Sequence, residues 1–212
     1  MALMKNYIMN TKFYVIGIFG MLLAKTSVAG TIDTSGQEPF EQCAYCHEYD
    51  GNSLMQAYPR LAGQQKMYLI KQLNDFKSGK RKSQMQATAE LLTDNDIKSV
   101  ADYFSKQVLT NKKVKLKSDF SDARVLFNQG IEKRGLMACS SCHGESGEGA
   151  GVIPRISGQH EDYLVKELLG FKSRTRKNDE AGFMRDIAKN LTDREIRLLS
   201  AYLASGNVGK MN

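Results

Sequence analysis

The sequence predicts an all-α protein made of two tandem, similar domains. Residues 58–82 align without a gap to residues 153–177, and thirteen of the 25 positions are identical, which indicates an internal duplication. Residues 85–97 match residues 184–196 in the same way. Apolar residues recur at helical spacing, and no alternating strand pattern of useful length occurs. Both observations therefore favour helices arranged in two equivalent halves.

The first 29 residues have the layout of a secretory signal peptide. Lys5 and Lys12 precede an apolar run at residues 13–24, and small residues at 27–29 suit cleavage. The apolar run is short for a membrane span. An uncleaved N-terminal anchor is the alternative, and either reading places the rest of the chain outside the cytoplasm.

The remaining chain divides into a first domain at residues 30–105, a linker at 106–118 and a second domain at 119–212. The proposed linker is rich in lysine and lacks helical periodicity. We therefore predict that it is a solvated connection between the two domains.

Two helices near the ends of the domains are the best defined. Thr192 with Glu195 makes a capping-box pattern, and Thr93 with Asp96 makes a weaker version of it. Residues at i, i+3, i+4 and i+7 follow each cap, which predicts one buried helix face per domain. These faces consist of Ile97, Val100, Ala101 and Phe104, and of Ile196, Leu199, Ser200 and Leu203.

The charge after residue 29 is mild, with 27 basic against 23 acidic residues. Four of the basic residues lie close together in the linker, and without them the charges balance. Nucleic-acid binding therefore has little support. These four residues are Lys112, Lys113, Lys115 and Lys117.

The cysteines define the chemistry. All four lie in two C-x-x-C-H motifs, which are typical of covalent attachment of c-type haem. The motifs are Cys43-Ala-Tyr-Cys46-His47 and Cys139-Ser-Ser-Cys142-His143. The thiols would form thioether bonds to haem, and each histidine would bind iron. Zinc is the alternative, but each half offers three ligands and no obvious fourth. Because each domain has fewer than 100 residues, haem would also complete its core.

The second axial ligand of each iron is predicted to be methionine, which suits electron transfer. The candidates are Met55, Met67 and Met85 in the first half, and Met184 and Met211 in the second. Only Met85 and Met184 align with each other in the repeat. We therefore predict that these two residues are the axial ligands.

Three further residues attract attention near these motifs. His160 is the remaining histidine, and we expect it to be a surface or half-buried residue because its repeat partner is Gln65. Arg60 and Arg155 follow the two repeated prolines and could pair with haem propionates. A solvated arginine is the alternative at both positions.

In these motifs the chain resembles the cytochrome c4 family, periplasmic dihaem proteins with two class I cytochrome c domains. The resemblance rests on the two C-x-x-C-H motifs, on PRLAGQ and PRISGQ, on QLNDFKSGKRK and ELLGFKSRTRK, and on Met followed by LTDNDI or LTDREI. It implies His/Met ligation of both irons and delivery of electrons to a terminal oxidase, with quinol–cytochrome c reductase as a second expected partner. It also implies that the carbonyls of Pro59 and Pro154 accept hydrogen bonds from His47 and His143.

The two halves differ at two places beside the expected haems. Glu48 follows the first motif whereas Gly144 follows the second, so we expect the chain to run differently there. The second half also has four extra residues before Met184. The first half therefore does not predict the conformation of this loop.

The function predicted from these features is electron transport in the periplasm by a protein carrying two haems. One alternative is a dihaem enzyme such as a peroxidase, which needs an open iron position and acid–base groups nearby. Another is a cytochrome subunit of a larger membrane complex, and peripheral association with the membrane stays open.

Overall fold

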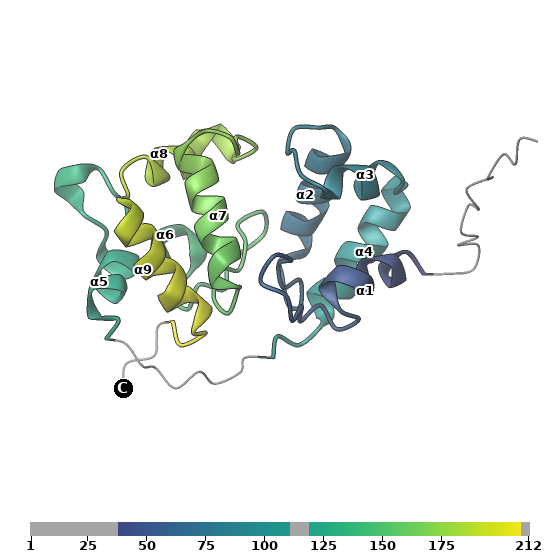
Figure 1. Ribbon diagram of the computed structural model, residues 1–212, viewed down its shortest axis with the longest axis horizontal. Coiled ribbons are helices and arrows are strands. Elements are labelled where there is room, and N and C mark those ends of the chain that lie inside the picture. Colours follow the sequence, from purple (N-terminus) through teal and green to yellow (C-terminus); the bar gives the residue numbers. More distant parts are fainter. Residues whose placement is uncertain (1–37, 111–118, 209–212) are drawn as a thin grey trace, which may run out of the picture. The chain divides into compact units, whose positions relative to one another are not determined.

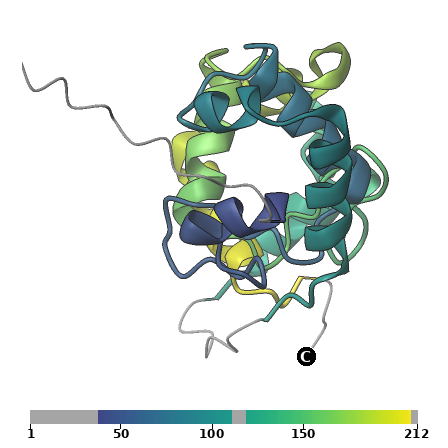
Figure 2. The ribbon, with the colours of Figure 1, turned by 90° about the vertical axis from the view of Figure 1, so that its right-hand side faces the viewer.

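The first half of the chain contains four α-helices in the computed structural model, which describes residues 38–110 and 119–208 (Figure 1). They are α1 (Pro39–His47), α2 (Lys66–Lys77), α3 (Met85–Glu90) and α4 (Asp94–Lys106). Helix α4 packs against α1 and α2, and α2 packs against α3. Figure 2 looks onto this half and shows α1 and α4 around its centre. The buried core consists of Leu69, Leu73, Ile97, Val100, Ala101 and Phe104.

The second half repeats this plan with short additions. Its α-helices are α5 (Ser121–Gln129), α6 (Ser140–His143), α7 (Glu161–Lys172), α8 (Phe183–Ala188) and α9 (Asp193–Ala204), with 3-10 turns η1 (Glu132–Arg134) and η2 (Glu180–Gly182). Helix α9 packs against α5 and α7, and α7 packs against α8. Its core includes Phe127, Leu164, Ile196, Leu199 and Leu203.

The described residues contain isolated β-bridges but no strand, as the sequence predicts. In the same residues no helix combines the length and apolar character that crossing a membrane requires. The predicted signal peptide, the four linker lysines and Met211 lie outside the described residues.

Both capping boxes are confirmed. The Thr93 hydroxyl accepts a hydrogen bond from the Asp96 amide, and Thr192 does the same for Glu195. Each acidic side chain accepts a reciprocal bond from its threonine amide, which satisfies two donors at the start of the helix. All eight residues of the two predicted helix faces are buried.

The chain runs the same way after both C-x-x-C-H motifs, so the expected difference at Glu48 and Gly144 is wrong. Glu48 has φ 63° and ψ 157°, and Gly144 has φ 82° and ψ 160°. This conformation suits glycine and is costly for a residue with a Cβ atom. At this position the first half therefore contains backbone strain that the second half avoids by using glycine.

Replacing Glu48 with Gly should consequently stabilise the protein by about 1 kcal/mol, because the strain disappears. Denaturant unfolding followed by circular dichroism measures this change. Gly144→Ala is the reverse experiment and should destabilise, since a Cβ there would lie 2.4 Å from the Glu148 carboxyl group. A loss of stability in Glu48→Gly would contradict the strain argument.

The four extra residues of the second half fall within residues 178–183, a segment that contains the η2 turn directly before α8. Ala181 in this turn has φ 46°, and Gly182 has φ 82°. The buried Asp179 carboxylate anchors the segment by accepting hydrogen bonds from the Arg185 amide at 3.0 Å and from its Nε at 2.8 Å. Met184 is therefore the second residue of α8, whereas Met85 is the first residue of α3.

Candidate haem sites

The first C-x-x-C-H motif occupies the last turn of α1. His47 is only 4% exposed, and its Nδ1–H donates to the carbonyl oxygen of Pro59 at 2.9 Å. Burial lowers the pKa of this imidazole, which favours the neutral form. Because Nδ1 carries the proton, Nε2 keeps its lone pair and is free to bind a metal ion.

The second motif repeats this arrangement around the short helix α6. His143 is 7% exposed and donates from Nδ1 to the carbonyl oxygen of Pro154, again at 2.9 Å. Burial lowers the pKa of this imidazole as well. The two hydrogen bonds that the family resemblance implies are therefore both present.

No disulfide joins the four cysteines, so all four sulfur atoms are available for thioether bonds to haem. Burial raises the pKa of Cys43 and of Cys139 to about 11, so both stay protonated at neutral pH. A free thiol pair one turn before a buried neutral imidazole fits covalent haem attachment. No group of three or more His, Cys, Asp or Glu side chains within the described ranges is placed to hold a metal ion.

The methionines separate into two kinds. Met85 packs against the core of the first half, and Met184 is half-buried in α8. Met55 and Met67 are 56% and 54% exposed. The half-buried methionines, Met85 and Met184, are those that the repeat predicts as axial ligands.

Two arginines beside the proline acceptors each have one side-chain nitrogen without a hydrogen-bond partner, although their other nitrogens donate to backbone carbonyls. The Nε atoms of Arg60 and Arg155 are buried without a hydrogen-bond partner, and no carboxylate of the described residues pairs with either guanidinium. Burial and the nearby charge of Arg60 lower the pKa of Arg155 to about 10. Buried cationic donors without an anion fit haem propionates, which would supply the missing charge and acceptors.

His160 does not lie at the surface as expected. It is 4% exposed, and its Nε2–H donates to the backbone oxygen of Ser53 in the other half at 2.9 Å. The expectation is wrong because it considered His160 within its own domain, whereas a contact between the halves buries this side chain.

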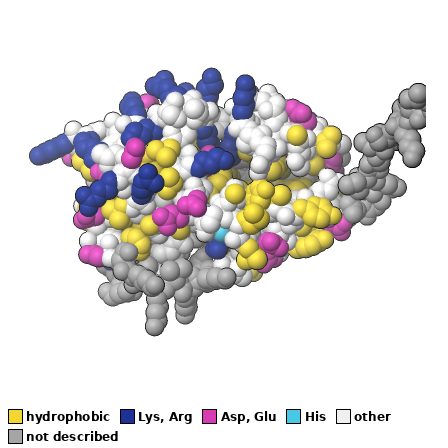
Figure 3. All heavy atoms as spheres, viewed as in Figure 1, with side chains coloured by type: hydrophobic (Ala, Val, Ile, Leu, Met, Phe, Trp, Pro, Cys, Tyr) yellow, Lys and Arg dark blue, Asp and Glu magenta, His cyan; other side chains and the backbone are white. Residues whose placement is uncertain are grey.

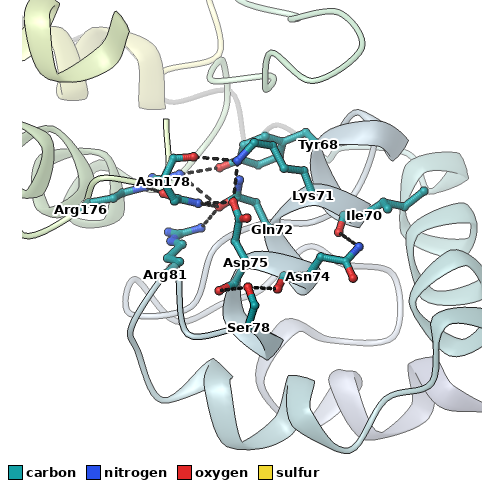
Figure 4. Close-up of polar contacts among 10 residues, drawn as sticks. All are labelled: Tyr68, Ile70, Lys71, Gln72, Asn74, Asp75, Ser78, Arg81, Arg176 and Asn178. Carbon is teal, nitrogen blue, oxygen red and sulfur yellow. Dashed lines mark hydrogen bonds and ion pairs between the residues drawn. The ribbon is translucent and has the colours of Figure 1, made fainter. Parts of the chain in front are cut away.

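The sequence also did not reveal a buried ionic cluster between the halves, of which Figure 4 shows Tyr68, Gln72, Arg81 and Arg176. Glu167 accepts from Arg81 at 2.8 Å and from Arg176 at 2.7 Å. Arg81 also donates to the hydroxyl of Tyr163, and Arg176 donates to that of Tyr68. We call these five residues with Gln72 the arginine cluster. Its only signal in the sequence is the repeated order Tyr, Gln or Glu, Arg.

Gln72 occupies the repeat position of Glu167 and is neutral. Its Oε1 accepts from Arg81 at 2.7 Å and from Asn178 at 3.0 Å. Asn178 also donates to Asp75, and Lys71 donates to the Asn178 carbonyl at 2.7 Å (Figure 4). The contact between the halves is therefore polar at this cluster, and the Glu167 carboxylate lies between the guanidiniums of Arg81 and Arg176.

The helical halves, their free thiol pairs and their buried imidazoles define a two-domain c-type cytochrome. The Cytochrome c family model matches residues 129–207. Cytochrome c4 of Thiocapsa roseopersicina is 40% identical over 165 residues, and the match covers 76% of this chain and 85% of that protein. The chain belongs to the cytochrome c4 family.

Two further similarities extend this result. The crystal structure of reduced recombinant cytochrome c4 from Pseudomonas stutzeri has a TM-score of 0.74 and 34% identity, and the match covers 81% of this chain and 96% of that one. A thiosulfate dehydrogenase electron acceptor of Stutzerimonas stutzeri strain A1501 is 34% identical over 173 residues, which is 79% of each chain. The protein is therefore a dihaem c-type cytochrome of electron transfer, with covalently bound haem c.

Proposed function

We propose that this protein is a periplasmic electron carrier that receives electrons from one redox protein and passes them towards a terminal oxidase. Haem supplies the one-electron redox chemistry when it is bound. The observation that supports this proposal most strongly is the repeated site, in which a buried imidazole is fixed through Nδ1 and leaves Nε2 free in each half.

The proposal assigns one haem to each domain. The thiols of Cys43 and Cys46 attach the first haem, and those of Cys139 and Cys142 attach the second. His47 with Met85 bind the first iron, and His143 with Met184 bind the second. Arg60 and Arg155 are assigned to the propionates, because their buried Nε atoms need acceptors. The domain limits are those expected from the sequence, with the linker at residues 106–118.

A carrier is favoured over a peroxidase because each half contains a buried histidine and a half-buried methionine that can serve as the two axial ligands. Two axial protein ligands would leave the iron without an open position for a substrate. The peroxidase assignment would instead be supported if the purified wild-type protein turned over peroxide and one of its haems readily bound cyanide.

One relative suggests a different electron donor for this chain. The Stutzerimonas protein is described as an electron acceptor of thiosulfate dehydrogenase, so the donor of this chain could be that kind of enzyme rather than quinol–cytochrome c reductase. Rates of reduction of the ferric protein by each purified donor would separate the two. A fixed subunit of a larger membrane complex would instead co-purify with that complex.

Exposed hydrophobic side chains suit docking of such partners. Tyr45 lies inside the first motif and Tyr49 follows it, and they are 86% and 64% exposed. Leu54 and Met55, further along, are 71% and 56% exposed. Figure 3 shows hydrophobic side chains gathered over the first half of the chain. An exposed apolar surface of this kind commonly marks a contact site for another protein.

Purified mature protein should carry two covalently bound haems, because both motifs are complete and their thiols are free. Intact mass and haem staining after denaturing electrophoresis give the count. N-terminal sequencing of the native protein tests the expected start at Gly30 and therefore the export. One haem, or none with bound zinc, would defeat the proposal.

A further inference from the structure

The repeated glutamine of each half binds the backbone of the other half. Gln159 accepts from the Arg60 amide at 2.8 Å and donates to the Arg60 carbonyl at 3.0 Å. Gln64 accepts from the Arg155 amide at 2.7 Å and donates to the Arg155 carbonyl at 2.9 Å. Both glutamines are buried, at 4% and 5% exposed. We call these contacts the glutamine pairs.

The amide that each glutamine binds belongs to a peptide group already used by a candidate iron ligand. The Arg60 N–H shares its peptide with the Pro59 carbonyl, which accepts from His47. In the second half, the Arg155 N–H shares its peptide with the Pro154 carbonyl, which accepts from His143. A continuous chain of hydrogen bonds therefore joins each histidine to a glutamine of the opposite domain.

Hydrogen bonds on the two ends of one peptide group strengthen each other. When the N–H donates to the glutamine oxygen, the carbonyl oxygen gains negative charge and becomes a better acceptor. A better acceptor draws the histidine Nδ1–H more strongly and makes Nε2 a stronger ligand. A stronger nitrogen ligand favours ferric over ferrous iron.

We propose that Gln64 and Gln159 are positioning residues that tune the haem of the opposite domain through the proline–arginine peptide. Gln159 acts on the first haem and Gln64 acts on the second. The contact between the domains thereby helps to set the reduction potentials of both haems. The inference rests on the proposed function, because it takes His47 and His143 as iron ligands.

The glutamines are held in place before any change of redox state. Each Oε1 also accepts from the amide of the following residue, Gln65 at 2.9 Å and His160 at 3.0 Å. The preceding glycines are tied to the last turns of α4 and α9, since Gly63 donates to the Phe104 carbonyl and Gly158 to that of Leu203. Such a side chain can hold the peptide without losing further rotational freedom.

The decisive experiment replaces Gln159 with Leu, which fills similar space without hydrogen-bonding atoms. The first haem should then favour the ferrous form on the order of threefold at fixed applied potential. This is an upward shift of about 28 mV, since a tenfold change is 59 mV for a one-electron couple. Gln64→Leu should shift the second haem instead. A Met184→His background, which lowers the second potential, assigns the two waves of the spectroelectrochemical titration.

The matched control is Gln65→Leu. Gln65 also donates twice across the same contact, to the Glu148 and Gly149 carbonyls, but it does not touch the Arg155 peptide. This variant should leave both waves in place. Equal shifts in Gln159→Leu and Gln65→Leu, or a shift in the wrong domain, would mean that loosened packing is responsible and would overturn the inference.

Two outcomes keep this inference distinct from the proposed function. If the wild-type protein has two His/Met haems but neither glutamine variant shifts a reduction potential, only the inference is overturned. Wild type without two such haems overturns both. If Gln159→Leu does not assemble with haem, Gln159→Met provides the same comparison, because its unbranched side chain fills the space without an amide.

Discussion

Changing Met184 to Ala is expected to remove about half of the near-infrared charge-transfer band that marks methionine bound to ferric haem. One of two equivalent methionine–iron bonds is lost, and the band counts such bonds. The second haem should then bind carbon monoxide or cyanide, and its reduction potential should fall because thioether sulfur stabilises ferrous iron. Spectroelectrochemistry with added cyanide measures all three effects.

Variants at the other methionines provide the controls. Met85→Ala should produce the same changes at the first haem. Met55→Ala and Met67→Ala should leave the band intact, because these two side chains are more than half exposed. An unchanged band in Met184→Ala would mean that another residue, Met211 among them, binds the second iron.

The second large effect is expected at Glu167, whose carboxylate lies between Arg81 and Arg176. Replacing it with Gln leaves two buried guanidiniums without a counter-charge. Removing one partner of a buried ionic group commonly costs about 3 kcal/mol of unfolding free energy. Denaturant unfolding of the haem-loaded protein measures the loss.

The pH dependence gives an independent check on the same residue. Burial raises the pKa of Glu167, but the charges and hydrogen bonds of the two guanidiniums together outweigh burial and hold this pKa below its ordinary value of 4.5. Its contribution is therefore fully present above that value and disappears as the pH falls through the folded pKa. Wild type and Glu167→Gln should differ at neutral pH and converge in acid. Asp186→Asn, which breaks an exposed pair with Lys189, should hardly change stability. A constant difference at every pH would contradict the ionic explanation.

The sequence predicted the helices well because their signals are local. A capping threonine and a 3.6-residue period are complete within one helix, so the faces around Ile97 and Ile196 could be placed without knowing the rest of the fold. The bonds from His47 and His143 to the two prolines were available only through the family resemblance. The eight assigned haem residues stay predictions, which the mass and ligand experiments test.

The contacts between the halves could not be predicted for the opposite reason. Gln64 and Arg155 are 91 residues apart, and a buried glutamine has the same sequence pattern as a solvated one. The prediction that His160 is a surface or half-buried residue was wrong for this reason. The prediction of a different backbone path at Glu48 was wrong because this residue adopts the conformation that suits glycine, although it is not glycine.

The reciprocity of the glutamine pairs also describes how two separate copies of one ancestral domain would associate. When residue i of one copy touches residue j of the other and the reverse is equally true, the contact has the form of a symmetric dimer. The difference between Gln72 and Glu167 breaks that symmetry. Two first halves would bring two arginines together with two neutral glutamines, whereas one half of each kind brings a carboxylate. The charge of a single side chain thus opposes association of two first halves and favours pairing of a first half with a second half.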